Sequence, residues 1–416
     1  MSLIARAPAL APFRVRSFRF QWPADLLASW AFEMEGIILG WFVLVTTGSV
    51  LALTAFGSLQ FLGTLISPVF GMAGDRIGSR KVLLLMRFTY LVIASALAVL
   101  FLAGLASPVP VFMLAAIMGL VRASDNTLRT LLIGETMPTD YLMRAMSVLR
   151  TTADSARIAG ALSGAALVAT LGSDFAYVAV SGTYAFCLAL TFGVGTHRLH
   201  VPAVRETPLS SLRALREGFA YVWSTPAVRA VMLLAILVNV TAFPLVASLL
   251  AYVAKDIYGL DQTGLGWLIA CFAAGGLAGS IAISMYGTHI RPARAMLVCA
   301  VVWLLLNLMF SWVIAPSLGK VILFLAGFVQ SFCMIPMALI LLRVTNPALR
   351  GCVMGVRTLA VYGLPVGLLL SGPLIQWVGF AATGTLYSTL GIIFTVLIGF
   401  CWRRDLWDRT APVNMR

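Results

Sequence analysis

The sequence has few charged residues and almost no histidine. Only 11% of its 416 residues are charged, 3 are histidines, and 61% are hydrophobic. A soluble domain keeps roughly a quarter of its residues charged. The mean hydropathy of +0.98 implies more apolar surface than a single core of this length can bury. The composition therefore excludes a water-soluble globular protein and indicates a chain whose solvent is lipid.

Groups that bind metals or nucleotides are equally scarce. The 6 cysteines lie singly in or beside apolar stretches, so we predict neither a disulfide framework nor a cysteine metal site. His197 and His200 have a spacing that can bind metal, but they stand in a polar loop, and we predict no metal and no cofactor. No Gly-x4-Gly-Lys-Ser/Thr loop occurs, and no nucleophile–histidine pair can form within the apolar stretches. We therefore expect neither an enzyme nor an ATP-driven pump.

Apolar stretches of about twenty residues, the length that crosses a bilayer, recur along the whole chain. Those before a polar segment at 197–226 cover 22–47, 50–73, 82–104, 109–134, 144–170 and 175–196. Those after it cover 228–254, 264–287, 294–315, 319–342, 352–377 and 382–402. The sequence thus predicts an all-α membrane protein with twelve transmembrane helices. Its parts are an N-terminal six-helix bundle at 1–196, a linker at 197–227 and a C-terminal six-helix bundle at 228–416.

Basic residues concentrate in every second loop between these stretches. In a soluble protein the net charge of +14 would suggest nucleic acid, but here its distribution follows the positive-inside pattern of membrane proteins. We therefore expect no nucleic-acid partner, both termini in the cytoplasm and an even number of spans. Leucine and aromatic residues recur at helical spacing over 209–222, which predicts an amphipathic helix at the cytoplasmic interface.

The two halves of the chain resemble one another. A shift of 207 or 208 residues superposes parts of the fourth and fifth predicted helices on parts of the tenth and eleventh. The coinciding glycines are Gly119 with Gly327, Gly160 with Gly367, and Gly172 with Gly379. Parallel repeats of six helices are typical of transporters in which one half rocks against the other.

The loop between the second and third predicted helices has the sequence Gly71-Met-Ala-Gly74-Asp75-Arg76-Ile-Gly78-Ser-Arg80-Lys81. It resembles the signature loop of the major facilitator superfamily almost position for position. The resemblance implies the major facilitator fold, alternating access, and a conformational latch formed by Gly71, Gly74, Asp75, Arg76, Gly78, Arg80 and Lys81. The corresponding loop at 287–294 keeps basic residues but lacks the acid, so we expect a one-sided latch.

Segments at 13–22, 216–226 and 350–372 resemble the enterobactin-exporter and macrolide-efflux branch of that superfamily. The branch implies a monomer in a bacterial-type inner membrane that exports a siderophore or amphipathic drug, driven by protons. Antiporters of the superfamily usually have Gly-Pro late in the fifth helix, whereas this chain has Gly160-Ala-Leu-Ser-Gly164. This departure leaves the direction of transport open.

Ionisable residues within the spans lie mostly in the first half of the chain. Because placing a charge inside the membrane costs free energy, these residues are candidates for function. No histidine lies in a span, so we predict that carboxylates carry the coupled protons, at Glu33, Glu35, Asp125 and Asp154. Residues 33 and 35 are about 200° apart on a helix, and the sequence does not decide which of them faces the cavity. Charges on the fourth and fifth helices can also be explained as packing pairs. We interpret Arg87 and Arg129 as snorkelling residues near helix ends.

A substrate site is predicted from one arginine of the first half and from polar, aromatic and methionine side chains of the second. These residues are Arg122, Asn239, Phe243, Trp267, Gln330, Met334 and Met337. A site lined by aromatic and methionine side chains suits a bulky, partly apolar small molecule. Ordinary packing explains each residue of the second half equally well. Two alternatives remain: an importer whose Arg122 holds a small organic anion, and a lipid flippase or scaffold without proton coupling.

Overall fold

The computed structural model of the protein describes residues 8–64, 77–195, 208–286, 291–345, 353, 356–357 and 359–404. Throughout these ranges the chain forms helices and short connections, and no β-strand occurs among them. The predicted all-α membrane fold is therefore confirmed.

Within the described ranges, 9 helices are long and apolar enough to cross a membrane. Two shorter apolar segments, Val50–Thr64 and Gly363–Val378, accompany them. The longest helical segment joins two of the predicted helices at Gly172, whose backbone has φ 77° and ψ 169°. The twelve predicted spans are reached only when the shorter segments are included and the longest is divided at this glycine.

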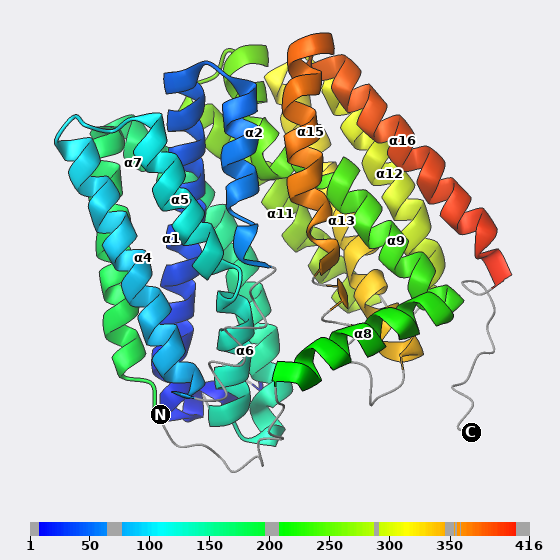
Figure 1. Ribbon diagram of the computed structural model, residues 1–416, viewed down its shortest axis with the longest axis horizontal. Helices are drawn as coiled ribbons and strands as arrows, with labels where there is room; N and C mark the ends of the chain where they lie inside the picture. Colours follow the sequence, from blue (N-terminus) through cyan, green and yellow to red (C-terminus); the bar gives the residue numbers. More distant parts are fainter. Residues whose placement is uncertain are drawn as a thin grey trace. The chain divides into compact units, whose positions relative to one another are not determined.

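One compact unit, called unit 1 here, comprises Met1–Thr47 and Leu59–Arg205. Its long helix α7 packs against α1 and α4, and α4 also contacts α5 and α6 (Figure 1). The helices α5 and α6 form one span that is broken at Ala123 and Ser124. The elements of unit 1 are η1 (Pro8–Arg14), α1 (Arg16–Thr47), η2 (Leu62–Thr64), α4 (Ser79–Leu102), α5 (Pro108–Arg122), α6 (Asp125–Thr136) and α7 (Thr139–Phe192).

The other compact unit, unit 2, comprises Gly48–Ser58 and Glu206–Arg416. Within it α13 packs between α11 and α12, while α9 contacts both α15 and α16. The segments η3 and η4 are π-helical turns within one span. The elements of unit 2 are α2 (Val50–Leu59), α8 (Pro208–Ser224), α9 (Pro226–Thr241), η3 (Leu245–Leu249), α10 (Leu250–Tyr252), η4 (Val253–Ile257), α11 (Gln262–Tyr286), α12 (Pro292–Trp312), α13 (Pro316–Val344), α15 (Gly363–Val378) and α16 (Phe380–Cys401).

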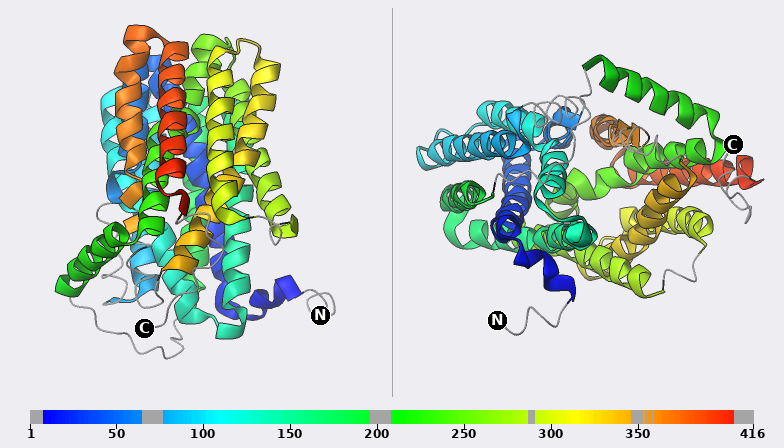
Figure 2. Two further views of the ribbon diagram at one scale, coloured as in Figure 1. Left: turned by 90° about the vertical axis from the view of Figure 1, so that its right-hand side faces the viewer. Right: turned by 90° about the horizontal axis from the view of Figure 1, so that it is seen from below.

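Helix α8 lies in the segment where the sequence predicts an amphipathic helix. Within unit 2 it runs across the direction of α9, as the two views of Figure 2 show. Phe219 and Trp223, one turn apart on α8, are both exposed. Only Thr225 separates α8 from the span that begins at Pro226. This arrangement is typical of a helix that lies at a membrane surface.

The glycines that coincide in the two halves occupy equivalent packing positions. A Cβ atom at Gly119 would collide with the backbone oxygen of Leu59, so within unit 1 α5 closely approaches the chain at Leu59. A Cβ atom at Gly327 would collide with the backbone oxygen of Phe272, which brings the tenth helix equally close to the eighth. Small residues allow such close approach of helices in membranes.

The glycines of the fifth and eleventh predicted helices repeat in the same way. Gly160 packs against Trp30 and Glu33 of α1, whereas Gly367 packs against Val240 of α9. Gly379, the counterpart of Gly172, has φ 84° and ψ 167°, which nearly equal the angles of its partner. Positive φ at this position favours glycine. The internal repeat in the sequence is therefore a repeat in backbone geometry.

Candidate functional site

Four ionisable side chains form a buried cluster in unit 1, called the charge cluster here: Asp25 of α1, Arg87 of α4, and Asp125 and Arg129 of α6. None has more than 3% of its surface exposed. Asp25 accepts a hydrogen bond from Arg87 and lies 3.5 Å from Nε of Arg129. Arg129 also forms an ion pair with Asp125 one turn earlier. Two arginines thus balance two aspartates across three helices.

Neutral groups also contact the charge cluster. Arg87 donates to the Thr191 hydroxyl of α7, and Nη1 of Arg129 donates to Ser29 Oγ at 2.8 Å. The hydroxyl of Tyr90 lies 3.5 Å from Oδ1 of Asp125. Asp125 is the first residue of α6, where the positive end of the helix dipole favours a carboxylate. The break between α5 and α6 therefore places this acid at a helix start inside the span.

The interpretation of Arg87 and Arg129 as snorkelling residues is wrong. Both guanidinium groups are buried and paired, at 0% and 3% exposure. Asp25, which was not selected from the sequence, is the acceptor that both arginines share. The sequence gives little indication of this role, because Asp25 lies two residues after Pro23, at the polar beginning of the first apolar stretch.

Glu35 has a different environment from the acids of the charge cluster. It is 5% exposed and accepts hydrogen bonds from the hydroxyls of Tyr177 at 3.2 Å and Tyr184 at 2.9 Å. Among the residues that the structure describes, no arginine, lysine or histidine lies within ion-pair distance of it. The two tyrosines are seven residues apart on α7, which places them on one helical face. That spacing is a signal in the sequence from which this site could have been predicted and was not.

Glu33 points to another side of α1. Its carboxylate lies 3.4 Å from Nε of Arg157, and the two side chains are 27% and 50% exposed. The sequence left open which glutamate faces a cavity. The structure separates them: Glu35 is enclosed between α1 and α7, whereas Glu33 lies on the partly exposed surface of unit 1.

Arg122 ends α5, just before the break in the span. Its Nη1 donates to Gln60 Oε1 at 3.2 Å, and its guanidinium lies 4.5 Å from the ring centre of Phe32. Within the described part of the chain it has no carboxylate within ion-pair distance. It therefore differs from Arg87, Arg129 and Arg157, each of which contacts an acid.

The predicted substrate residues of the second half occupy varied positions in unit 2. Asn239 donates to the Ala235 carbonyl at 2.8 Å, and Phe243 packs edge-on against Trp303 at 5.0 Å. Met337 is fully buried, Gln330 and Met334 are half-buried, and Trp267 is 51% exposed. No hydrogen bond or ring contact described in the structure joins any two of the six predicted residues. Gln330, Met334 and Met337 lie about one turn apart on α13, which places them on one face of that helix.

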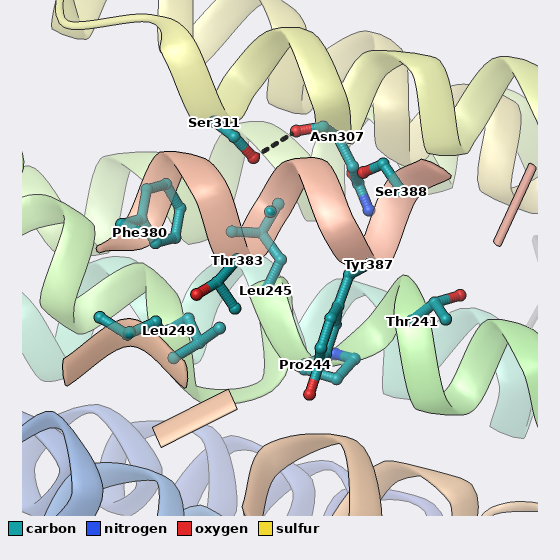
Figure 3. A pocket seen from close by; sticks show the side chains of 12 residues that line it. Thr241, Pro244, Leu245, Leu249, Asn307, Ser311, Phe380, Thr383, Tyr387 and Ser388 are labelled. Atoms are coloured by element: carbon teal, nitrogen blue, oxygen red, sulfur yellow. Dashed lines mark hydrogen bonds between the residues drawn. The ribbon is translucent and has the colours of Figure 1, made fainter. Parts of the chain in front are cut away.

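Unit 2 contains a small pocket that was not predicted from the sequence (Figure 3). Its volume is about 30 Å³, and apolar side chains line it together with several hydroxyl groups and one amide, beside the π-helical turn η3. Asn307 is 4% exposed, and its Oδ1 has no hydrogen-bond partner. Ser311 donates to the backbone oxygen of Asn307, and Tyr387 donates to that of Gly367. The pocket has room for one or two water molecules.

Much of the predicted latch lies outside the described residues, namely Gly71, Gly74, Asp75 and Arg76, and the side chain of Asp154 is not described either. Gly78 precedes α4 with φ 96°, a conformation that favours glycine. Arg80 donates to the backbone oxygen of Phe192 at 2.6 Å, which ties the start of α4 to the end of α7. Lys81 is exposed.

Comparison with known proteins gives similar sequences and similar folds. The multidrug efflux pump Tap of Mycolicibacterium fortuitum is 26% identical over 386 residues, which cover 89% of this chain and 92% of that protein. The solved structure of the POT family transporter PepTSo has a TM-score of 0.78 at 14% identity, covering 94% and 99% of the two chains. A D-xylose–proton symporter has a TM-score of 0.70 at 13% identity, covering 92% and 97%.

A match to a family model supports the interpretation of the signature loop, the repeated glycines and the helical fold. The model of the Major Facilitator Superfamily matches residues 22–364, most of the chain and all the helices that form the charge cluster and the Glu35 site. The chain is thus a membrane transporter that belongs to the Major Facilitator Superfamily.

Proposed function

We propose that this protein is a proton-coupled exporter of an amphipathic organic molecule, working by alternating access. The similarity to a multidrug efflux pump over nearly the whole length of both chains supports export. The fold alone does not set the direction, because a sugar–proton symporter has a similar structure. The proposal places the protein in a bacterial-type inner membrane with both termini in the cytoplasm, as the distribution of basic loops predicts.

The observation that carries the proton coupling is the contact of Glu35 with two tyrosine hydroxyls. A hydroxyl group both donates and accepts, so Tyr177 and Tyr184 can serve this side chain with or without its proton. The guanidinium groups around Asp25 and Asp125 are positively charged and only donate, so they favour the ionised form of these acids. Glu35 is therefore the acid whose surroundings suit both states, and we assign the transported proton to it.

The remaining acids have supporting parts in this proposal. Asp125 joins the charge cluster to Tyr90, whose ring lies 5.8 Å from that of Tyr184, so the cluster and Glu35 share one packed interior. Glu33 and Asp154 stay candidates for a second coupling step. The residues of the signature loop stay the proposed latch, and the transporter is proposed to act as a monomer.

The proposal is tested with purified protein in proteoliposomes that enclose a pH-sensitive dye. A lipophilic cation such as ethidium is added, and proton movement is recorded for the wild type and for Glu35→Gln, Asp125→Asn and Glu33→Gln. We expect Glu35→Gln to lower substrate-driven proton movement at least tenfold. Asp174→Asn is the matched control, because Asp174 is an exposed acid at the junction beside Gly172. Full coupling in all three variants would refute a proton-coupled exporter.

Arg122 supports a second candidate function, import of a small organic anion. It has a guanidinium group in a span without an acid partner among the described residues, and such a group can bind a carboxylate. Uptake of labelled organic acids into intact cells, compared with accumulation of ethidium in a deletion strain, separates the two functions. If the protein is an importer, Arg122→Gln abolishes uptake of the organic acid. If it is an exporter, the deletion strain accumulates more ethidium than the wild-type strain.

A further inference from the structure

A groove on unit 2 lies between α12 and α16, which run side by side (Figure 1). Its volume is about 520 Å³, which falls in the range of small-molecule sites. Aliphatic side chains of α12 form one wall, and Val396 and Phe400 of α16 form the other. The groove shares no lining residue with the charge cluster, with the Glu35 site or with the pocket of Figure 3.

The groove is open because of one glycine. A Cβ atom at Gly399 would lie 3.4 Å from Cδ1 of Leu297, an ordinary contact, so a side chain here would occupy the groove without displacing the backbone. The rims are well exposed, at 61% for Val298 and 76% for Phe400. In a chain that spans a membrane, such an apolar outer surface lies against acyl chains rather than water.

One end of the groove has basic residues. Arg403 lines it two residues after the end of α16, and Arg294 lies one turn before Val298 on α12. Because Leu297 faces Gly399, the start of α12 and the end of α16 lie at the same end. The first turn of a helix carries a partial positive charge, so α12 adds to the attraction. Among the residues that the structure describes, only apolar side chains and Thr395 line the rest of the groove.

We propose that this groove binds one anionic phospholipid, with its phosphate at Arg403 and an acyl chain across Gly399. From Thr395 to Arg403 the helix rises about 12 Å, so the groove holds the upper part of one chain while the rest stays in the bilayer. A lipid fits because the apolar walls lie on the outer surface of the bundle and the single charged end is where a headgroup would be. This site is independent of the proposed transport reaction.

The test measures lipid retention by native mass spectrometry after the purified protein is exchanged into mixed micelles. The probes are phosphatidylglycerol and phosphatidylcholine with identical chains. We expect at least a tenfold preference for phosphatidylglycerol in the wild type, which corresponds to about 1.4 kcal/mol. Arg403→Gln should abolish the preference, whereas Arg144→Gln, which removes an exposed arginine at the start of α7, should leave it unchanged.

A second pair of variants fills space instead of removing charge. Gly399→Leu should lower retention of phosphatidylglycerol at least tenfold. Gly182→Leu is its control, because Gly182 is an exposed glycine of α7 at which an added Cβ atom would meet no other atom within 4 Å. Equal retention in Gly399→Leu and Gly182→Leu overturns the proposal, as does a wild type without lipid preference. A wild-type dimer that Gly399→Leu converts to a monomer would show instead that the groove is an interface between copies.

Discussion

Asp25 contacts two arginines from different helices, and its replacement tests how the charge cluster holds unit 1 together. In Asp25→Asn the carboxylate that accepts from Arg87 and lies near Arg129 becomes a neutral amide. One aspartate, Asp125, then faces two buried guanidinium groups. Removing one partner of a buried ion pair costs about 3–5 kcal/mol, which is a large part of the ~5–15 kcal/mol by which proteins are stable.

A double-mutant cycle separates the ion pair from other effects of the substitution. Arg87→Met alone leaves Asp25 with a single arginine and should also destabilise the protein. The double variant removes one charge of each sign, so the cluster is balanced again. We expect the double variant to recover about 0.5–3 kcal/mol relative to the sum of the single changes, the range measured for residues in contact.

The assay is reversible unfolding in micelles of dodecylmaltoside with increasing sodium dodecyl sulfate, followed by tryptophan fluorescence. Asp256→Asn is the control, because its ion pair with Lys255 is about one-third exposed and such pairs contribute about 0–1 kcal/mol. If Asp25→Asn costs no more than this control, or if the single changes simply add, the charge cluster does not stabilise unit 1 as argued.

Two further predictions concern tyrosines. Replacing both Tyr177 and Tyr184 by phenylalanine should lower the rate of proton-coupled transport about tenfold, because Glu35 loses two hydrogen bonds. Their combined loss need raise the barrier by only ~1.4 kcal/mol to give that factor. Unchanged coupling in proteoliposomes would contradict the assignment of the proton to Glu35. Tyr258 lies between two spans, and burial raises its pKa to about 12 from 10. The unfolded chain therefore loses this proton first, and thermal stability should fall between pH 10 and 12 more steeply in the wild type than in Tyr258→Phe. Equal slopes in the two proteins would show that this tyrosine does not contribute.

Features with a repeating pattern were predicted well from the sequence. Apolar stretches of bilayer length predicted the helices, and the shift of about 207 residues predicted that Gly172 and Gly379 have equivalent positions, which their nearly equal backbone angles confirm. These features depend on local composition and on backbone conformation, which nearby residues largely determine. The signature loop likewise indicated the superfamily that the family model shows.

The partners of single charged residues were predicted poorly. Arg87 and Arg129 lie near helix ends in the sequence, and only packing of α1, α4 and α6 shows that both point inward to Asp25. An ion pair between residues about 60 or 100 positions apart leaves no periodic signal. Glu33 and Glu35 were indistinguishable for the same reason, because their environments are formed by residues of α7.

The sequence by itself determined that this chain spans a membrane with two similar sets of helices, because apolar length and glycine spacing act locally and repeat. Only the tertiary structure decided which buried acids pair with arginine and which one meets two hydroxyl groups. That choice depends on the rotation of each helix against its neighbours, and close packing across α1 and α7 determines that rotation. The membrane-buried charges thus divide into a balanced cluster and a separate Glu35 site.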